Sequence, residues 1–243
     1  MGQTLASGLS ALGRFSIAAL VDTREPADLF GATYASSWDD VDASTIDVVV
    51  DFSSPEGVVA SATWCAAHGV GLVIGTTGLS SDQRHVVEDA ATKVGVVIAA
   101  NYSLGAVLSE KFAALAAPYF ERVEIIELHH DKKADAPSGT SIAAAKGIAA
   151  ARSAAGLSDM IDPTVRHTVS GARGADTIGG IKIHSVRLPG LVAHQEILFG
   201  GPGEGLTIRH DSFDRLSFVQ GVALAADTID ATPRLIDGIE SLI

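Results

Sequence analysis

The sequence predicts an α/β fold built around a parallel sheet that is buried on both faces. The first half of the chain contains short apolar segments rich in β-branched residues, at 15–21, 47–52, 71–74 and 95–100. Helical segments separate the last three of them, and strands that alternate with helices in this way are typical of βαβ units. Because each segment is apolar almost throughout, rather than at alternate positions, we expect helices to cover both faces of the sheet.

Composition and charge narrow the classes of function. The chain has 243 residues, 47% of them hydrophobic, and its 29 acidic and 17 basic side chains give a formal charge of −12. Nucleic-acid binding needs basic surface to meet phosphates, so this charge argues against it. Mean hydropathy is +0.30, yet no apolar run reaches the ~18 residues that a membrane span needs. We therefore expect neither a nucleic-acid partner nor a membrane.

Cysteine usage bears on disulfides, metals and location. The single cysteine, Cys65, excludes an intrachain disulfide and a zinc site built on several thiolates, and we expect no metal. A chain without disulfides fits a reducing compartment, and the first residues lack the layout of a signal peptide. The expected location is the cytoplasm.

The helices of the first half follow from apolar spacing and from the residues that end each segment. A helix is expected over residues 1–12, where three leucines recur at helical intervals before a glycine ends the run. A second helix is expected at 56–68, after a Ser-Ser-Pro turn and before Gly69, and a third at 81–93.

The pattern changes after residue 103. A helix at 104–117 leads to a strand at 121–130, a polar loop at 131–139 and a helix at 140–155, whereas residues 156–175 have weak periodicity and are expected to be loop-rich. Segments separated by Gly and Pro turns predict sequential antiparallel strands at 182–187, 191–199 and 206–211.

The end of the chain returns to helical spacing. Helices are expected at 217–229 and 233–242, with the C-terminal part packing back on the first half. We therefore divide the chain into a first domain of residues 1–102 with 216–243, and a second, mixed α+β domain of residues 103–215.

An acidic residue follows the first expected strand. In dinucleotide-binding folds a carboxylate at such a strand tip accepts hydrogen bonds from the adenosine ribose, about 20 residues after the glycine loop. Asp22 lies 20 residues after Gly2. The alternative is an aspartate that caps a helix or a turn. Arg24 is placed to meet a 2′-phosphate instead, so NADH and NADPH both remain open.

Small and polar residues follow the third and fourth strands. Gly75-Thr76-Thr77 follows one, and Ala99-Ala100-Asn101-Tyr102 follows the other. Ligands of open α/β sheets bind beyond the carboxyl ends of strands, and small residues there let a nicotinamide and its ribose approach the backbone. The alternative for each segment is an ordinary tight loop.

Residues 127–140, ELHHDKKADAPSGT, concentrate histidine and lysine before an expected helix start. Free N–H groups and the positive end of the helix favour a carboxylate or phosphate there. His129 and His130, if both are in strand geometry, point to opposite faces, so only one of them faces a given reacting atom. The segment describes a pocket for a small polyanion with a proton donor inside it; the alternative is a solvated charged loop.

This segment resembles the signature of the 4-hydroxy-tetrahydrodipicolinate reductase (dihydrodipicolinate reductase) family of the lysine/diaminopimelate pathway. The signature reads E-x-H-H-x-x-K-x-D-A-P-S-G-T, and every fixed position is present. Further segments occur in the family's order: DFSSPEG, VIGTTG, AANYSLG, GIKIHSVRLPGLVAHQEILFG and DSFDRLSF. The spacing from Asp22 to Asp51 is closer to actinobacterial members than to enteric ones.

The resemblance implies a Rossmann-like dinucleotide-binding domain and an α+β substrate-binding and oligomerisation domain with a mixed or antiparallel sheet. It implies reduction of 4-hydroxy-tetrahydrodipicolinate, a small dicarboxylate, by NADH or NADPH in a homotetramer that pairs through the sheet of the second domain. His129 matches the family's proton donor and Lys133 its second catalytic residue. Matches to substrate contacts are His130, Ser138, Gly139 and Thr140. Matches to cofactor contacts are Gly2, Asp22, Gly75, Thr76, Thr77, Ala99, Ala100, Asn101, Tyr102, Arg215 and Phe218.

The start of the sequence departs from the family's pattern. The family begins with a strand and a G-x-x-G-x-x-G loop, of which only the last glycine, Gly2, is present. One rival hypothesis is therefore a catalytically silent binding or scaffold protein. Another is a Rossmann-type reductase of a different small acid, which has no need of the His-His-Lys loop. We expect Met1 to be internal to a longer reading frame whose preceding codons encode a β-branched run and two glycines three residues apart.

Overall fold

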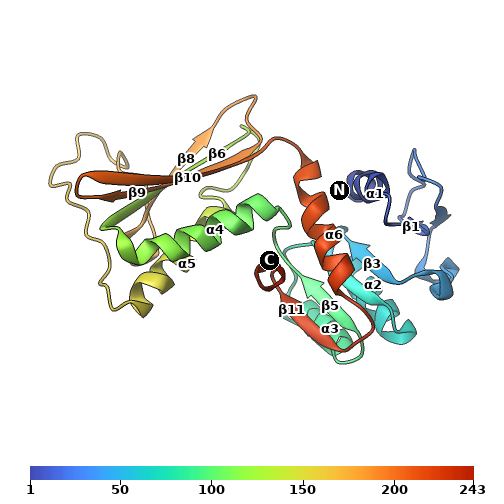
Figure 1. The fold of residues 1–243 in the computed structure, drawn as a ribbon. Helices are drawn as coiled ribbons and strands as arrows, with labels where there is room; N and C mark the ends of the chain where they lie inside the picture. Colours follow the sequence, from blue (N-terminus) through green and yellow to red (C-terminus); the bar gives the residue numbers. More distant parts are fainter. The chain divides into compact units, whose positions relative to one another are not determined.

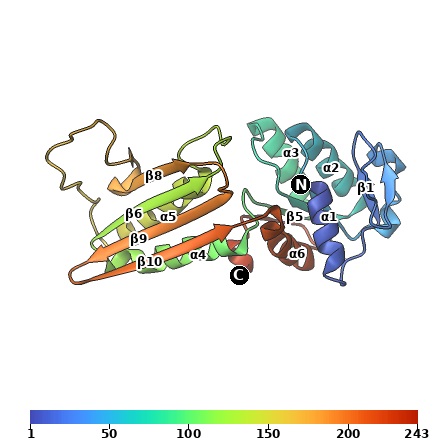
Figure 2. The same ribbon diagram turned by 90° about the horizontal axis from the view of Figure 1, so that it is seen from above.

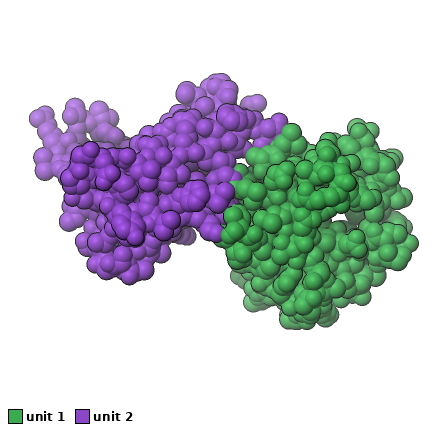
Figure 3. All heavy atoms as spheres, in the orientation of Figure 1, with its two compact units in different colours: residues 1–104, 215–243 green, residues 105–214 purple.

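The computed structural model describes residues 1–243 and divides the chain into two units (Figure 3). Unit 1 comprises Met1–Leu104 and Arg215–Ile243, and unit 2 comprises Gly105–Asp214. The C-terminal residues belong to the first unit. The domain bounds of 102 and 216 that the sequence suggests lie within two residues of these divisions.

The main sheet of unit 1 is parallel and has the strand order β11-β5-β4-β3. Its strands are β3 (Val48–Asp51), β4 (Gly71–Ile74), β5 (Gly95–Ile98) and β11 (Arg234–Asp237). Every residue of β4 and β5 is buried, as expected for interior strands of continuous apolar sequence. A separate parallel pair joins β1 (Ala19–Val21) to β2 (Thr33–Ala35), so only the end of the segment expected as a strand at 15–21 is paired.

Helices cover both faces of the main sheet (Figure 1). They are α2 (Pro55–His68), α3 (Ser81–Ala91) and α6 (Val219–Thr228), and α1 (Gly2–Ala11) lies against α6. The core between α2, α3 and the sheet is apolar throughout, whereas α6 packs on the opposite face. Gly221 permits that approach, because a Cβ there would lie 2.0 Å from the carbonyl oxygen of Tyr102. None of the helices in the structure is long and apolar enough to cross a membrane.

Unit 2 is built on a mixed sheet with the strand order β10-β9-β6-β8-β7 (Figure 2). Its strands are β6 (Arg122–His129), β7 (Ala175–Asp176), β8 (Lys182–Arg187), β9 (Ala193–Gly201) and β10 (Glu204–Ser212). The helices α4 (Leu104–Ala116) and α5 (Gly139–Ala154) lie against one face of this sheet (Figure 1). Their small residues, such as Ala113 and Ala144, pack against isoleucines of β6, β8 and β9.

Short 3-10 helices complete both units. They are η1 (Trp38–Asp40), η2 (Ala43–Thr45), η3 (Ala117–Tyr119), η4 (Ile178–Gly180), η5 (Arg215–Phe218) and η6 (Glu240–Leu242). Residues 156–174 contain no helix or strand, as the weak periodicity predicts.

The expected helix at 233–242 is wrong. The segment forms β11, which pairs with β5 in parallel register, and then η6. Gly238, with a φ of 80°, ends the strand after four residues. A run this short does not separate the two periodicities, and the free edge of β5 supplies the hydrogen-bond partners that decide for a strand.

The expected order of the antiparallel strands is wrong in part. β9 and β10 form an antiparallel hairpin, but β8 pairs with β6 in parallel, and β6 lies between β8 and β9. The cause is α5, which follows β6 and makes β6-α5-β8 a crossover unit; such a connection returns the chain parallel to its starting strand. β6 is thereby placed inside the sheet, with partners on both sides of His129.

The close approach of α6 in unit 1 gives a test of the packing. Gly221→Ala should lower the free energy of unfolding by about 1–3 kcal/mol, because the backbone oxygen beneath it must move. Gly147→Ala, in the exposed middle of α5 where a Cβ meets nothing within 4 Å, should raise it by about 0.5–1 kcal/mol. Urea unfolding of both variants checks the pair. A Gly221→Ala protein as stable as the parent would contradict the packing described.

Candidate active site

A cavity of about 440 Å³ opens in unit 1 at the carboxyl ends of β4 and β5. Thr76 and Thr77 line it from the loop after β4, and Ala99 and Ala100 line it from the loop after β5. The structure thus brings four of the expected cofactor residues to one cavity, at the sheet edge where open α/β sheets bind their ligands.

Two charged residues that were not expected at this site also line the cavity. Arg84 of α3 donates from Nη2 to Oδ2 of Asp237 at 2.8 Å, and both border the cavity. Asp237 was missed because its segment was expected to be helical and not to end a strand at this edge. Asn101, by contrast, is an expected residue, and its Oδ1 accepts the backbone N–H of Ser103 at 2.9 Å.

A buried carboxylate holds the loop after β4. Asp51, only 6% exposed, accepts hydrogen bonds from Ser61 Oγ at 2.6 Å, from Ser53 Oγ at 2.7 Å and from Thr76 Oγ1 at 3.2 Å. The Thr76 hydroxyl in turn accepts the N–H of Ser53 at 2.9 Å. The side chain of Thr76 is therefore committed to the protein, and its backbone is what it presents to a ligand.

Aromatic packing shapes the same edge. A Cβ at Gly75 would lie 2.1 Å from the ring of Phe52, so only glycine fits there. Phe52 contacts Tyr102 and Phe218, with ring centroids 5.5 and 6.5 Å away. Burial raises the pKa of the Tyr102 phenol, which donates to the carbonyl of Ile74 at 2.7 Å. The Tyr102 side chain is thus a packing element, and a cofactor contact by it is limited to the backbone.

Three further expected residues lie elsewhere in unit 1. Asp22 follows β1, and its Oδ1 accepts the N–H of Arg24 at 3.2 Å and the hydroxyl of Thr23 at 3.3 Å, which leaves Oδ2 available. Gly2 begins α1, where the first N–H groups have no partner within the helix and a Cβ would meet nothing within 4 Å. Arg215 begins η5, which lies against α1.

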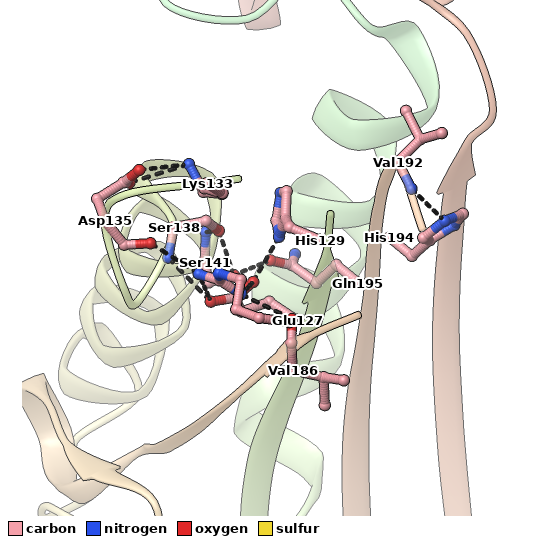
Figure 4. A network of polar contacts seen from close by, with 11 residues as sticks. Glu127, His129, Lys133, Asp135, Ser138, Ser141, Val186, Val192, His194 and Gln195 are labelled. Atoms are coloured by element: carbon pink, nitrogen blue, oxygen red, sulfur yellow. Dashed lines mark hydrogen bonds and ion pairs between the residues drawn. The ribbon is translucent and has the colours of Figure 1, made fainter. Parts of the chain in front are cut away.

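In unit 2, His129 ends β6 beside a fully buried glutamate (Figure 4). Glu127 is 0% exposed, and its Oε2 is hydrogen-bonded to Nδ1 of His129. Arg187 donates to both oxygens of Glu127 at 2.8 Å each, and the N–H of Ser138 donates to Oε1 at 3.3 Å. Because an ionised carboxylate only accepts, Nδ1 of His129 carries the proton in this contact and Nε2 is left for another partner.

Burial and charge act against each other in this group. Burial opposes ionisation of Glu127, but hydrogen bonds from Arg187, Ser185 and His129 outweigh it and hold the pKa of Glu127 below its ordinary value. Burial also lowers the pKa of His129; Glu127 raises it, and the charges of Lys133 and Arg187 lower it, with a net decrease. An imidazolium of lowered pKa gives up its proton readily near neutral pH.

The start of α5 offers backbone donors. Ser138 caps the helix, since its Oγ accepts the N–H of Ser141 at 3.2 Å, and the residue is only 3% exposed. Gly139 and Thr140 supply the first N–H groups of the helix, and a Cβ at Gly139 would meet nothing within 4 Å. The expected role of Ser138 as a substrate contact therefore does not extend to its hydroxyl, which is turned inward. Gly139 and Thr140 present the anion-binding end of the helix.

The loop between β6 and α5 carries the remaining charges. Lys133 donates from Nζ to both oxygens of Asp135, at 2.8 and 3.0 Å, and Asp135 is exposed. His130 lies outside the strand, is exposed, and accepts the N–H of Lys133 at its carbonyl at 3.2 Å. An exposed ion pair of this kind contributes little to stability, so an anionic ligand can replace Asp135 beside Lys133.

Sequence reasoning gave no role to Glu127 or Arg187. Glu127 has the same orientation in β6 as Val123 and Ile125, which are buried against the helices. This alternation is a signal, because a carboxylate on a buried face needs a partner. The partner itself lies sixty residues later, on β8. The structure contains no group of three or more His, Cys, Asp and Glu side chains placed to hold a metal ion.

The carboxylate beneath the strand ends of unit 1 can be tested. Asp51→Asn should lower the free energy of unfolding by about 1–3 kcal/mol, because the amide nitrogen that replaces one carboxylate oxygen cannot accept a hydrogen bond. The bonds from Ser53 and Thr76 to Oδ1 and the bond from Ser61 to Oδ2 can then not all be kept. Asp47→Asn, an exposed position just before β3, should stay within about 0.5 kcal/mol of the parent. Denaturant titration compares the two variants. Equal free energies of unfolding would show that the hydrogen bonds to Asp51 do not contribute to stability.

Comparison with known proteins gives matches over both units. Residues 1–102 match the family described as dihydrodipicolinate reductase, N-terminus, and residues 105–242 match that described as dihydrodipicolinate reductase, C-terminus. A 4-hydroxy-tetrahydrodipicolinate reductase of Corynebacterium urealyticum is 43% identical, over 97% of this chain and 96% of its own. One of Cutibacterium acnes is 46% identical, over 92% of this chain and 91% of its own.

Solved structures give a corresponding result. The chain resembles a dipicolinate-bound dihydrodipicolinate reductase from Paenisporosarcina sp. TG-14 with a TM-score of 0.87 and 38% identity, over 100% of this chain and 95% of that one. A probable dehydrogenase from Thermotoga maritima has a TM-score of 0.57 at 12% identity, over 99% of this chain and 89% of its own, which is a likeness of fold alone.

Proposed function

This chain is a member of the dihydrodipicolinate reductase family, and from that membership we propose that it reduces 4-hydroxy-tetrahydrodipicolinate to tetrahydrodipicolinate with NADH or NADPH, in lysine/diaminopimelate biosynthesis. The observation that carries the proposal is the end of β6. There a histidine with a free Nε2 stands on a buried carboxylate that also binds the start of α5. A proton donor and an anion-binding helix end are thereby held together.

The rival hypotheses have less support. The relatives that span nearly the whole chain are reductases, so a catalytically silent protein has no support among them. A reductase of a different small acid has no need of the His-His-Lys loop, which this chain retains with Lys133 beside the helix start.

The residues of unit 1 suit a nicotinamide dinucleotide. When bound, the reduced nicotinamide supplies a hydride to the ring of the substrate. The available oxygen of Asp22 would accept a ribose hydroxyl, and the free N–H groups at Gly2 would face phosphate. The cavity lined by Thr76, Thr77, Ala99 and Ala100 offers backbone groups and small side chains, which fit the nicotinamide end of the cofactor.

The residues of unit 2 suit a dicarboxylate. The N–H groups of Gly139 and Thr140 would bind one carboxylate, and Lys133, released from Asp135, would bind negative charge on the substrate. His130, exposed at the start of the same loop, is placed for a further contact. The TG-14 relative binds dipicolinate, itself a dicarboxylate, which supports this substrate class.

His129 would donate the proton that the reduction requires. Its Nε2–H is the free donor, while Nδ1–H remains hydrogen-bonded to Glu127 before and after the proton is transferred. The ring therefore keeps one orientation through the reaction, and after the transfer it is the neutral tautomer with its proton on Nδ1. A proton from solvent then restores it.

Assembly and location belong to the proposal as well. The face of the unit 2 sheet opposite α4 and α5 carries no helix, and Ile126, Val186 and Leu198 are half-buried on it. A second copy of the chain would cover this face, which supports pairing through the sheet; the homotetramer itself follows from the family resemblance. The lone, buried Cys65 suits a reducing cytoplasm.

The catalytic assignment predicts a separation of turnover from cofactor binding. His129→Ala and Lys133→Ala should each lower kcat by about 10²–10⁴-fold, the usual loss for a positioned acid–base group. NADH affinity should remain near that of the parent, because neither residue belongs to unit 1. A coupled assay with enzymatically generated substrate measures the first quantity, and fluorescence titration measures the second. Comparable loss of NADH affinity in both variants would overturn the assignment.

Asp22 gives a test of cofactor preference. Asp22→Ala should weaken NADH binding more than NADPH binding, because a carboxylate accepts a hydrogen bond from a 2′-hydroxyl and repels a 2′-phosphate. Asp28→Ala is the matched control, since Asp28 forms a similar turn with the N–H of Phe30 at 2.9 Å. Unchanged NADH affinity in Asp22→Ala would make Asp22 a turn residue only.

A further inference from the structure

We propose that Glu127 and Arg187 are a buried positioning pair for His129: the carboxylate fixes the ring, and the guanidinium balances the charge beside it. The inference rests on the proposed function, in which His129 donates a proton. Neither residue touches substrate in this scheme, and both act through the imidazole.

The geometry commits the carboxylate completely. Glu127 is fully buried, receives two hydrogen bonds of 2.8 Å from Arg187, and also receives the N–H of Ser138 and Nδ1 of His129. The Ser185 side chain is a further hydrogen-bond partner. A carboxylate has about four acceptor positions, so these donors leave none of them free. His129 lies two residues after Glu127 on the same face of β6, and Arg187 is its register partner on β8. The neighbouring strands β6 and β8 thus together fix the position of the His129 ring.

The charge balance follows from the same contacts. A bidentate arginine neutralises the carboxylate without removing it as an acceptor. Glu127 alone, buried and unpaired, would hold the imidazolium strongly and resist loss of its proton. Arg187 alone would repel the imidazolium. With both present, the ring is oriented by a carboxylate but is not next to a net negative charge.

The other groups around His129 do not upset this balance. In the loop after β6, Lys133 and Asp135 pair with each other. β9 and α5 present neutral side chains to the group, Gln195 and Ser141, which are hydrogen-bonded to each other at 2.6 Å. His194 of β9 has the opposite orientation in the sheet and pairs with Asp211 at 2.7 Å. The exposed His130 and the neighbouring Asp131 and Lys132 face solvent.

The opposite face of the same sheet carries a matched arrangement. Glu124 of β6 is hydrogen-bonded to Nε2 of His184 at 2.7 Å and to Nη1 of Arg173 at 3.3 Å. This trio has the same three residue types but is about one-third exposed. Glu124→Gln therefore removes a carboxylate from the same strand without touching His129, and it serves as the control.

The test measures the titration of His129 in two ways. NMR follows its imidazole in the cofactor-free protein, and the pH dependence of kcat follows it in turnover. A proton donor is active when protonated, so the rate falls as pH rises through its pKa. Glu127→Gln removes a negative neighbour and should move both the titration and this alkaline limb to lower pH, by about one pH unit. Arg187→Met removes a positive neighbour and should move them by about as much to higher pH.

A double variant keeps the test open if Arg187→Met, with its unpaired buried carboxylate, does not fold. Glu127→Gln with Arg187→Met leaves no charge in the pair, and a buried ion pair replaced as a whole is often tolerated. In this double variant the pKa of His129 should be higher than in Glu127→Gln and close to its value in the parent. Glu124→Gln should leave the alkaline limb of the pH dependence of kcat at the same pH as in the parent. In the parent, ¹⁵N shifts should place the proton of the neutral ring on Nδ1.

The outcomes separate the inference from the function on which it rests. Folded variants that shift in the same direction, or not at all, overturn the positioning pair, as does a neutral ring protonated on Nε2. Opposite shifts of the NMR titration support the pair even without turnover. If the two variants shift the NMR titration in opposite directions but the parent protein does not reduce the substrate, the positioning pair is supported and the proposed function is rejected.

Discussion

One buried carboxylate connects the separate pieces of unit 2. Glu127 reaches the end of β6 through His129, the end of β8 through Arg187 and the start of α5 through Ser138. Burying an ion without partners is strongly unfavourable, and removing one partner from a buried pair leaves the other uncompensated. The interior of the unit therefore tolerates this charge only in the arrangement that also assembles the site. The contacts that bury this charge are therefore the same contacts that fix the surroundings of His129.

In both units a buried carboxylate positions the loops, and other groups face the ligand. In unit 1 Asp51 anchors Ser53, Ser61 and Thr76 beneath the strand ends. In unit 2 Glu127 plays the corresponding part. In both, polar side chains hold the loops from behind, and small residues and backbone N–H groups form the surface offered to ligand. This arrangement suits anionic ligands, since backbone donors at helix starts carry partial positive charge that cannot be titrated away.

Much of this could be predicted from the sequence, for identifiable reasons. The bounds of β4 and β8 agree with those expected. β4 is a continuous apolar run, whereas β8 is marked by the Gly-Gly before it and the Pro-Gly after it. The cavity at the ends of β4 and β5 follows from parallel topology alone. β11 was beyond sequence reasoning, since four residues hold too little periodicity and only the edge of β5 decides them. Ser138 and Tyr102 belong to the recognised segments, yet their side chains cap and pack; a motif gives identity but not orientation. Glu127 and Arg187 meet only in the folded sheet.

The fit between Gly75 and Phe52 makes their evolution epistatic. The ring of Phe52 occupies the space that any side chain at position 75 would need, and it also contacts Tyr102 and Phe218. A larger residue at 75 is acceptable only after position 52 has become smaller, and that first change loosens the aromatic group beneath the loop. Positions 52 and 75 are therefore coupled, because the space for a side chain at one depends on the size of the other. Libraries that aim to alter the ligand preference of unit 1 should vary the two positions together.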